Sequence, residues 1–176
     1  MYVTIKKVKI INVIFLLLLS FIWHNVYKLF PNNIFAILFP VNESIWEHMK
    51  IIYYCLFISS LFEFYLYHKY KLFVNNFYIS MMIKSLLGVI VYLSLFLPIY
   101  LLVGEYIFIS ISLMLIVYIL MEFISYKILL SVDINMMILP VIILILGMIL
   151  FIILTFYPLY NFLFFDTIKL GYGILK

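Results

Sequence analysis

Residues 40–50, PVNESIWEHMK, place two carboxylates, a histidine, an asparagine, a tryptophan and a lysine inside a chain that otherwise carries mostly hydrocarbon side chains. The spacing also marks a helix start. Ser44, followed three residues later by Glu47, is a capping-box pattern in which both side chains accept hydrogen bonds from backbone N–H groups, and Asn42 is the competing cap. This segment therefore predicts that a long helix begins here and that polar chemistry gathers at its start.

The composition around this segment is that of a membrane protein. Of the 176 residues, 69% are hydrophobic and 10% are charged, and the mean hydropathy is +1.32. Soluble domains average roughly 45–50% apolar and about 25% charged residues. Runs of about 20 apolar residues recur, each long enough to cross roughly 30 Å of hydrocarbon. We therefore expect an all-α, polytopic transmembrane helix bundle, a single integral membrane domain over residues 1–176 in contact with the lipid bilayer.

Five apolar segments are long enough to span a bilayer. The apolar run at 34–39 is too short to cross as a helix, so we expect a re-entrant or interfacial piece there, closed by Pro40. The tail beyond Pro158 is short and interrupted, and we expect it along the membrane interface. The N-terminus resembles a secretory signal, but residues 23–25 (Trp-His-Asn) stand where small residues precede cleavage, which indicates an uncleaved first span. The predicted spans are about residues 10–30, 44–67, 77–102, 106–126 and 135–157.

The lysines predict the orientation, because cytoplasmic loops of membrane proteins carry an excess of basic residues. With the N-terminus inside, seven lysines fall on the inner side and four on the outer side. We therefore predict a multi-pass protein of a bacterial plasma membrane, with its N-terminus inside and its C-terminus outside. The basic residues are not clustered on one face, so we predict no nucleic-acid partner. The inner lysines are Lys6, Lys7, Lys9, Lys69, Lys71, Lys84 and Lys127, and the outer ones are Lys28, Lys50, Lys169 and Lys176.

In this topology, polar residues that are scattered along the sequence fall at the outer ends of the spans. Glu43 and Glu47 are four residues apart and would share a helix face with Lys50, whereas Ser44 and His48 would share a neighbouring face. We predict one binding cluster there, formed by His24, Asn42, Glu43, Ser44, Glu47, His48 and Asp166, with Glu105 and Tyr157 at the same level.

Structural roles compete with binding roles in this cluster. Glu47 is also the cap partner, Glu43 is a carboxylate of the kind that a helix N-terminus favours, and Trp46 is placed like an aromatic-belt residue. Adjacent Glu47 and His48 point about 100° apart, unlike the HExxH arrangement of zinc proteases. The sequence therefore predicts no metal site and no cofactor.

Three charged residues lie inside the predicted spans, near their inner ends: Glu63, Lys84 and Glu122. A charge inside a membrane is costly unless it is paired or reaches the interface. Because the three lie at similar depth, we expect a structural ion pair that links Lys84 to Glu63 or to Glu122. The single cysteine, Cys55, cannot form an internal disulfide.

PVNESIWEHMK is similar to the PVNES-x-WEHLK signature of an uncharacterised family of small polytopic bacterial membrane proteins, a domain of unknown function. The resemblance extends to residues 24–33, where a histidine leads to an aromatic residue and a double asparagine, and to the close of the chain at 157–158, 163–166 and 171–173. The chain departs from the family pattern at 159–160, where a second proline and a histidine are expected, and at 167–170. The resemblance implies a membrane location and no established activity.

Signatures of common enzyme and transporter classes are missing from the sequence. It contains no GxxxxGK[ST], GxGxxG, GxSxG, CxxC or HExxH motif, and no duplicated half like the repeats of many transporters. We therefore favour a non-enzymatic membrane protein whose outer cluster binds or passes a small polar ligand, an ion or a lipid headgroup. Two alternatives stay open: a membrane-embedded lipid or peptide hydrolase with Glu47 or His48 as general acid or base, and an accessory subunit with a membrane-protein partner.

Overall fold

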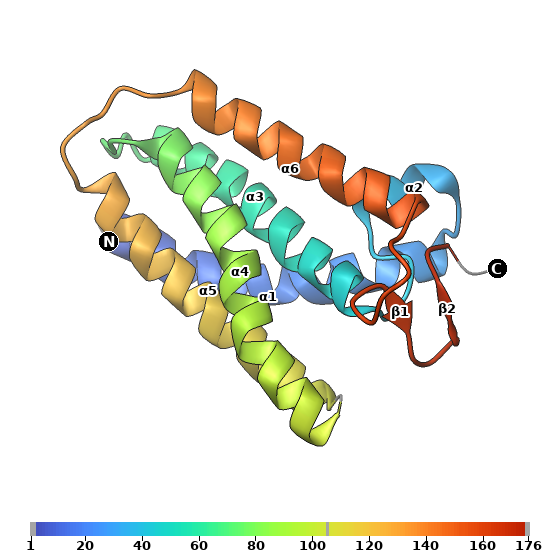
Figure 1. Cartoon of the computed structure of the whole chain (residues 1–176). Helices are drawn as coiled ribbons and strands as arrows, with labels where there is room; N and C mark the ends of the chain where they lie inside the picture. Colours follow the sequence, from blue (N-terminus) through green and yellow to red (C-terminus); the bar gives the residue numbers. More distant parts are fainter. Residues whose placement is uncertain (1–2, 105, 175–176) are drawn as a thin grey trace.

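The computed structural model describes residues 3–104 and 106–174, and this part of the chain is mainly helical, with only two strands of two residues each, which confirms the all-α prediction (Figure 1). Its helices alternate in direction along the long dimension of the molecule, so that the two termini lie at opposite ends (Figure 1). The elements are α1 (Ile5–Leu29), α2 (Asn33–Leu38), α3 (Ile45–Lys69), α4 (Phe77–Val103), α5 (Ile107–Leu129), α6 (Ile138–Phe156), β1 (Phe165–Asp166) and β2 (Gly171–Tyr172).

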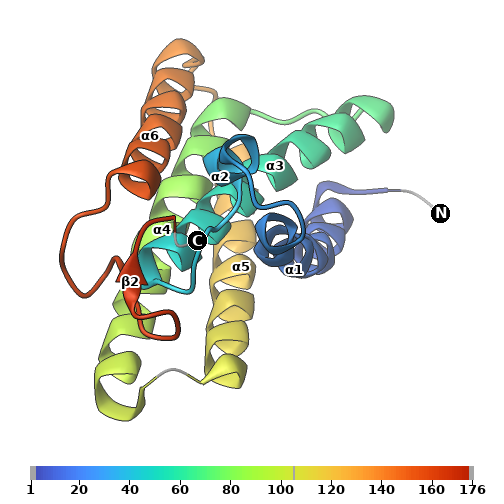
Figure 2. The ribbon, with the colours of Figure 1, turned by 90° about the vertical axis from the view of Figure 1, so that its right-hand side faces the viewer.

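Helix α3 is the centre of the bundle. A continuous stretch of its first half, from Ile51 to Leu56, is at most 2% exposed. It packs against α1 and α4, and α5 packs in turn against α1 and α4. The ends of α4 and α5 that are joined to each other project beyond the other helices, and Leu102 and Phe108 are more than 80% exposed there (Figures 1 and 2).

Among the described residues, four helices are long and apolar enough to cross a membrane: α3, α4, α5 and α6. Large apolar side chains such as Ile116, Ile119 and Ile145 are about half exposed on these helices, a surface that suits lipid rather than water. The chain is therefore an all-α membrane protein. Helix α1 is not among the four, so the predicted span over residues 10–30 stays a prediction, although α1 packs along α3 and α5.

Local capping sets the helix starts around the quoted segment. The Ser44 hydroxyl caps α3 and accepts the backbone N–H of Glu47 over 3.4 Å, as the sequence predicted. Asn32 caps α2, whose six residues match the short segment expected before Pro40. The capping box is only half formed, because the Glu47 carboxylate accepts the N–H of Val41 instead of reaching back to Ser44.

The C-terminal tail folds into a hairpin that the sequence did not predict. Strands β1 and β2 pair antiparallel and lie beside the start of α3 (Figure 2). Gly173 follows β2 with a φ of +65°, a backbone conformation that favours glycine, and a Cβ there would lie 3.1 Å from Cγ of Pro158. The hairpin therefore needs glycine at this position to close on the end of α6.

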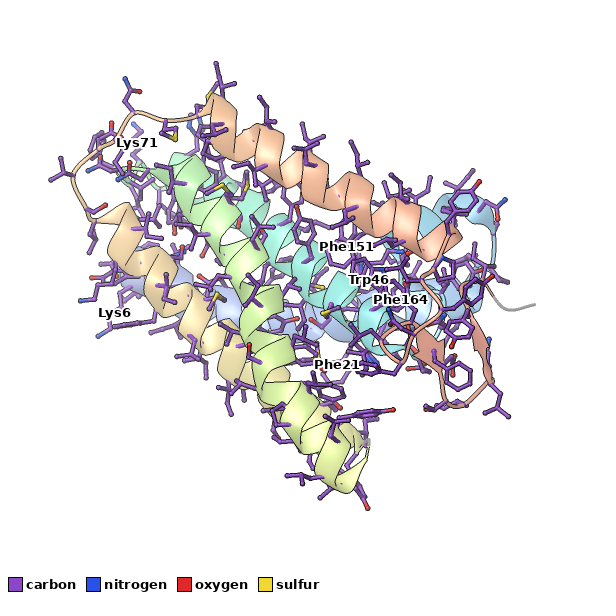
Figure 3. The ribbon with its side chains drawn as sticks, viewed as in Figure 1. Lys6, Phe21, Trp46, Lys71, Phe151 and Phe164 are labelled. Atoms are coloured by element: carbon purple, nitrogen blue, oxygen red, sulfur yellow. The ribbon has the colours of Figure 1, made fainter. Side chains whose placement is uncertain are left out.

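Trp46 joins the tail to the bundle. Its backbone N–H donates to the Leu163 carbonyl over 2.9 Å. Its ring stacks on Phe164 with centroids 4.7 Å apart and packs on Phe151 of α6 at 4.8 Å (Figure 3). The position of Trp46 in an aromatic belt stays a prediction, and its ring packs between two structural elements because α6 and the tail both cover this face of α3.

Four buried charged side chains join α1, α3, α4 and α5 at the end of the bundle that carries the N-terminus. Lys84 Nζ lies 3.0 Å from Glu63 Oε2 and 2.7 Å from Glu122 Oε1, so it contacts both predicted partners. Lys9 Nζ closes the ring from α1, at 2.8 Å from Glu63 Oε1 and 3.0 Å from Glu122 Oε2. The sequence places Lys9 among the lysines that set the topology, whereas the structure makes it a buried member of this charged ring.

Candidate functional site

A pocket of about 750 Å³ lies at the opposite end of the bundle from the charged ring, between α1, α3, α4, α5 and the tail. Much of its wall is apolar. One part of the wall carries four ionisable side chains that touch one another, His24, Lys28, Glu43 and His48, which we call the polar cluster. The apolar wall includes Leu17, Phe21 (labelled in Figure 3), Ile51, Ile107, Ile111 and Met114.

Glu43 is the centre of the polar cluster. Its Oε1 lies 2.7 Å from Lys28 Nζ and 3.4 Å from His24 Nε2, and its Oε2 lies 3.5 Å from His48 Nε2. The two imidazole rings are parallel to within 6°, with centroids 5.8 Å apart. Three cation-forming groups thus surround one carboxylate.

These surroundings stabilise the ionised form of Glu43. Contacts with the His24 and His48 imidazoles, and with the Lys28 ammonium, hold the pKa of the Glu43 carboxyl well below its ordinary value of 4.5, against the opposing effect of burial. Glu43 is therefore a carboxylate over the physiological pH range. It offers a fixed negative charge on the pocket wall.

The loop before α3 places Glu43 by hydrogen bonds that the tail supplies. The backbone N–H of Glu43 donates to Asp166 Oδ2 over 3.0 Å. On the preceding residue, Asn42 Nδ2 donates to the Gly173 carbonyl over 2.8 Å, and Asn42 Oδ1 accepts the N–H of Ser44 over 2.9 Å. Asn42, Ser44 and Asp166 therefore position the loop and do not line the pocket.

Asp166 also holds its own hairpin. The side chain is fully buried, and its Oδ1 accepts the backbone N–H groups of Ile168 and Lys169, each over 2.8 Å. With Oδ2 committed to the Glu43 N–H, both carboxylate oxygens are occupied. The sequence prediction that Asp166 belongs to the binding cluster is therefore corrected to a positioning role.

Glu47 belongs to a different, buried contact. Its Oε1 accepts the Thr155 hydroxyl over 2.7 Å, and its Oε2 lies 3.4 Å from Lys50 Nζ. Lys50 in turn donates to the carbonyls of Ala36 and Phe39 over 2.7 and 3.0 Å. These bonds fasten α2 and α6 to α3 with every charge buried and paired.

The prediction that Glu43 and Glu47 share a helix face is wrong for a local reason. Helix α3 begins at Ile45, so Glu43 precedes the helix and the four-residue helical spacing does not apply to it. Its carboxylate reaches His48, while Glu47 turns towards α6. Glu47 and His48 therefore face different neighbours, and the hydrolase alternative with Glu47 or His48 as general acid or base stays a prediction.

The structure thus brings together three of the seven predicted cluster residues: His24, Glu43 and His48. It adds Lys28, which the sequence analysis names only as an outer lysine. The spacing in the sequence could have predicted this contact, because His24 and Lys28 are four residues apart on one face of α1. In the structure, Lys28 Nζ lies 3.1 Å from His24 Nε2. Tyr157 is 77% exposed and does not line the pocket, and Glu105 lies outside the described residues.

The fold and the pocket define an all-α membrane protein with a polar cluster at one end of its helix bundle. The chain belongs to the family of unknown function DUF6512, whose profile matches residues 1–174. The family membership confirms the resemblance to an uncharacterised family, and it assigns no activity. No curated protein and no solved structure matches the chain.

Proposed function

We propose that this protein binds a small amphipathic molecule in the 750 Å³ pocket, with the polar head of the molecule at the polar cluster and its hydrocarbon part along the apolar wall. One observation carries the proposal: a single pocket combines an apolar wall with a carboxylate, Glu43, that contacts three other ionisable groups. Pockets of about 300–1,000 Å³ that are mainly apolar and carry a few convergent polar groups are typical of small-molecule sites.

The chemistry of the polar cluster suits a head that is itself polar or charged. Lys28 and the two imidazoles can donate hydrogen bonds to oxygen atoms of the head, while Glu43 can accept from donors. The Lys28 side chain is 52% exposed, so it can follow a head of variable size. A lipid headgroup and the head of a free amphiphile share this chemistry.

We also propose that the protein is a multi-pass protein of a bacterial plasma membrane, with α1 as a fifth span, its N-terminus inside and its C-terminus outside. The flanking lysines support this orientation after the buried Lys9, Lys50 and Lys84 are set aside, since five then remain on the inner side and three on the outer side. Alkaline phosphatase fused after Lys176 should be active. If, at the same position, only a reporter that works in the cytoplasm is active, this orientation is wrong.

Ligand binding can be measured by native mass spectrometry of the protein released from nanodiscs. Dodecyl phosphate and dodecanol serve as probes, because they share a chain and differ in the head. Met114 lines the pocket, and Met114→Trp should lower the bound fraction of dodecyl phosphate at least tenfold by filling the cavity. Ile116→Trp is the matched control on the same helix, because Ile116 is 47% exposed and lies outside the pocket lining.

Dodecyl phosphate should bind more tightly than dodecanol, since only its head pairs with Lys28 and the imidazoles. Equal binding of dodecyl phosphate by the wild type and by Met114→Trp would overturn the proposed pocket. A preference for dodecanol would overturn the role of the polar cluster.

A further inference from the structure

Three side chains of the polar cluster present metal-binding atoms from three separate elements. His24 lies on α1, Glu43 on the loop before α3, and His48 on α3. One ligand atom from each lies within 4.8 Å of the other two. Imidazole nitrogen with carboxylate oxygen is a donor set that zinc and similar divalent transition metals bind.

The separations fit a metal better than they fit hydrogen bonds. The Nε2 atoms of His24 and His48 lie 3.4 and 3.5 Å from oxygens of Glu43, whereas charge-assisted N–H···O bonds are about 2.7–2.9 Å. In a tetrahedral zinc site with metal–ligand bonds of about 2.0–2.1 Å, neighbouring ligand atoms are about 3.3 Å apart. Each imidazole nitrogen therefore stands near the length of a tetrahedron edge from one Glu43 oxygen, His24 from Oε1 and His48 from Oε2, and one ligand atom from each of the three residues lies within 4.8 Å of the others.

We propose that His24, Glu43 and His48 form a binding site for a zinc-class divalent cation, with its remaining coordination position open towards the pocket. This inference rests on the proposed function in one respect only: the molecule bound in the pocket is what would reach the open coordination position. Two histidines, one carboxylate and an open position form a ligand set typical of non-structural zinc sites. The sequence could not predict this metal site, because no helical spacing relates Glu43 to either histidine.

Lys28 competes with the metal for this site. Its ammonium lies 2.7 Å from Glu43 Oε1 and 3.1 Å from His24 Nε2, so it contacts two of the three ligand groups. Entry of a divalent cation requires the ammonium to move away. The half-exposed Lys28 side chain, in the last turn of α1, can turn to solvent.

Zinc affinity of the purified, chelator-stripped protein tests the inference by competition with a zinc indicator and by elemental analysis. We expect one Zn²⁺ per chain. His24→Ala and His48→Ala should each weaken binding at least 100-fold, and Glu43→Gln at least tenfold. His68→Ala is the matched control, because His68 is an exposed histidine near the other end of α3 and should leave the affinity unchanged.

Lys28→Met keeps the inference testable if a ligand variant fails to fold. This variant should bind Zn²⁺ several-fold more tightly than the wild type, because it removes the competing ammonium, and a damaged protein would not gain affinity. An unchanged or weaker affinity of Lys28→Met overturns the inference. So does Zn²⁺ binding that survives both histidine substitutions.

The two proposals fail in different ways. If Zn²⁺ does not bind but Met114→Trp still abolishes dodecyl phosphate binding, the metal site is wrong and the amphiphile pocket stands. If Zn²⁺ binds with the expected pattern of variants but Met114→Trp binds dodecyl phosphate as the wild type does, the metal site stands and the amphiphile pocket is wrong.

Discussion

Asp166 accepts the backbone N–H of Glu43 through Oδ2 over 3.0 Å, although 123 residues separate the two along the chain. This bond connects the C-terminal hairpin to the backbone of Glu43, the residue that carries the only acidic side chain of the polar cluster. The tail of the protein is therefore part of what positions the candidate site, even though its carboxylate does not face the pocket.

Loss of the Asp166 carboxylate should loosen both the hairpin and Glu43. Asp166→Ala removes the acceptor of three part-buried hydrogen bonds from backbone N–H groups, and the loss of each such hydrogen bond costs about 0.5–1.5 kcal/mol. We expect a clearly lower midpoint of thermal unfolding in detergent and a zinc affinity that is about 10–100-fold weaker. Asp133→Ala is the control, since Asp133 is an exposed loop residue and its removal should change neither quantity.

The stability of the protein should fall strongly when the charged ring loses one charge, and less when the ring loses one charge of each sign. Lys84→Met leaves the carboxylates of Glu63 and Glu122 buried with Lys9 alone, and breaking a buried ion pair in this way costs about 3–5 kcal/mol. Thermal unfolding should show this loss. Lys71→Met is the control, because Lys71 is an exposed lysine near the same end of the bundle (Figure 3). This change should leave the midpoint of thermal unfolding unchanged.

A second ring variant separates charge balance from packing. Lys84→Met combined with Glu122→Gln removes one charge of each sign, so it should be more stable than Lys84→Met alone. A double variant that unfolds at a lower temperature than the single variant contradicts the view that the charges of the ring balance one another.

Acidification should weaken the metal-free protein through Glu43. The pKa of Glu43 is depressed in the folded protein, so its contribution to stability is present above the ordinary value of 4.5 and is lost as the pH falls below it. Between about pH 4.5 and about pH 2 the unfolding midpoint of the wild type, measured with chelator present, should fall more than that of Glu43→Gln. Equal falls in the two proteins would show that the contacts with His24, His48 and Lys28 do not stabilise the carboxylate.

Gly147 allows α6 to approach Tyr53 of α3. A Cβ at Gly147 would lie 2.6 Å from the Tyr53 hydroxyl oxygen, and that hydroxyl donates to the Leu144 carbonyl over 2.6 Å. Gly147→Ala should therefore destabilise the protein by about 1–3 kcal/mol, the usual cost of overpacking. Tyr53→Phe in the Gly147→Ala background should recover part of this loss, because it removes the oxygen that the new methyl group meets. Additive effects of the two changes in a double-mutant cycle would contradict this contact.

Much of the fold could be predicted from the sequence because it depends on local properties. The apolar runs predicted five spans, of which four are helices long and apolar enough to cross a membrane, and the Ser44 cap predicted the start of α3. The paired strands of the tail could not be predicted, because strands of two residues leave no periodic pattern. They depend instead on distant contacts, such as the one between the N–H of Trp46 and the Leu163 carbonyl.

The sequence by itself determined that this is an all-α membrane protein and that its polar residues gather near helix ends, because burial of charge in lipid is costly wherever the chain crosses. Only the tertiary structure decided which of these residues meet. Glu43 joins His24 and His48, while Glu47 turns to Thr155, because the start of α3 separates the two carboxylates onto different neighbours. Likewise Lys9 reaches Glu63 across 54 residues, since helix packing, and not sequence spacing, sets the distance between side chains on different helices.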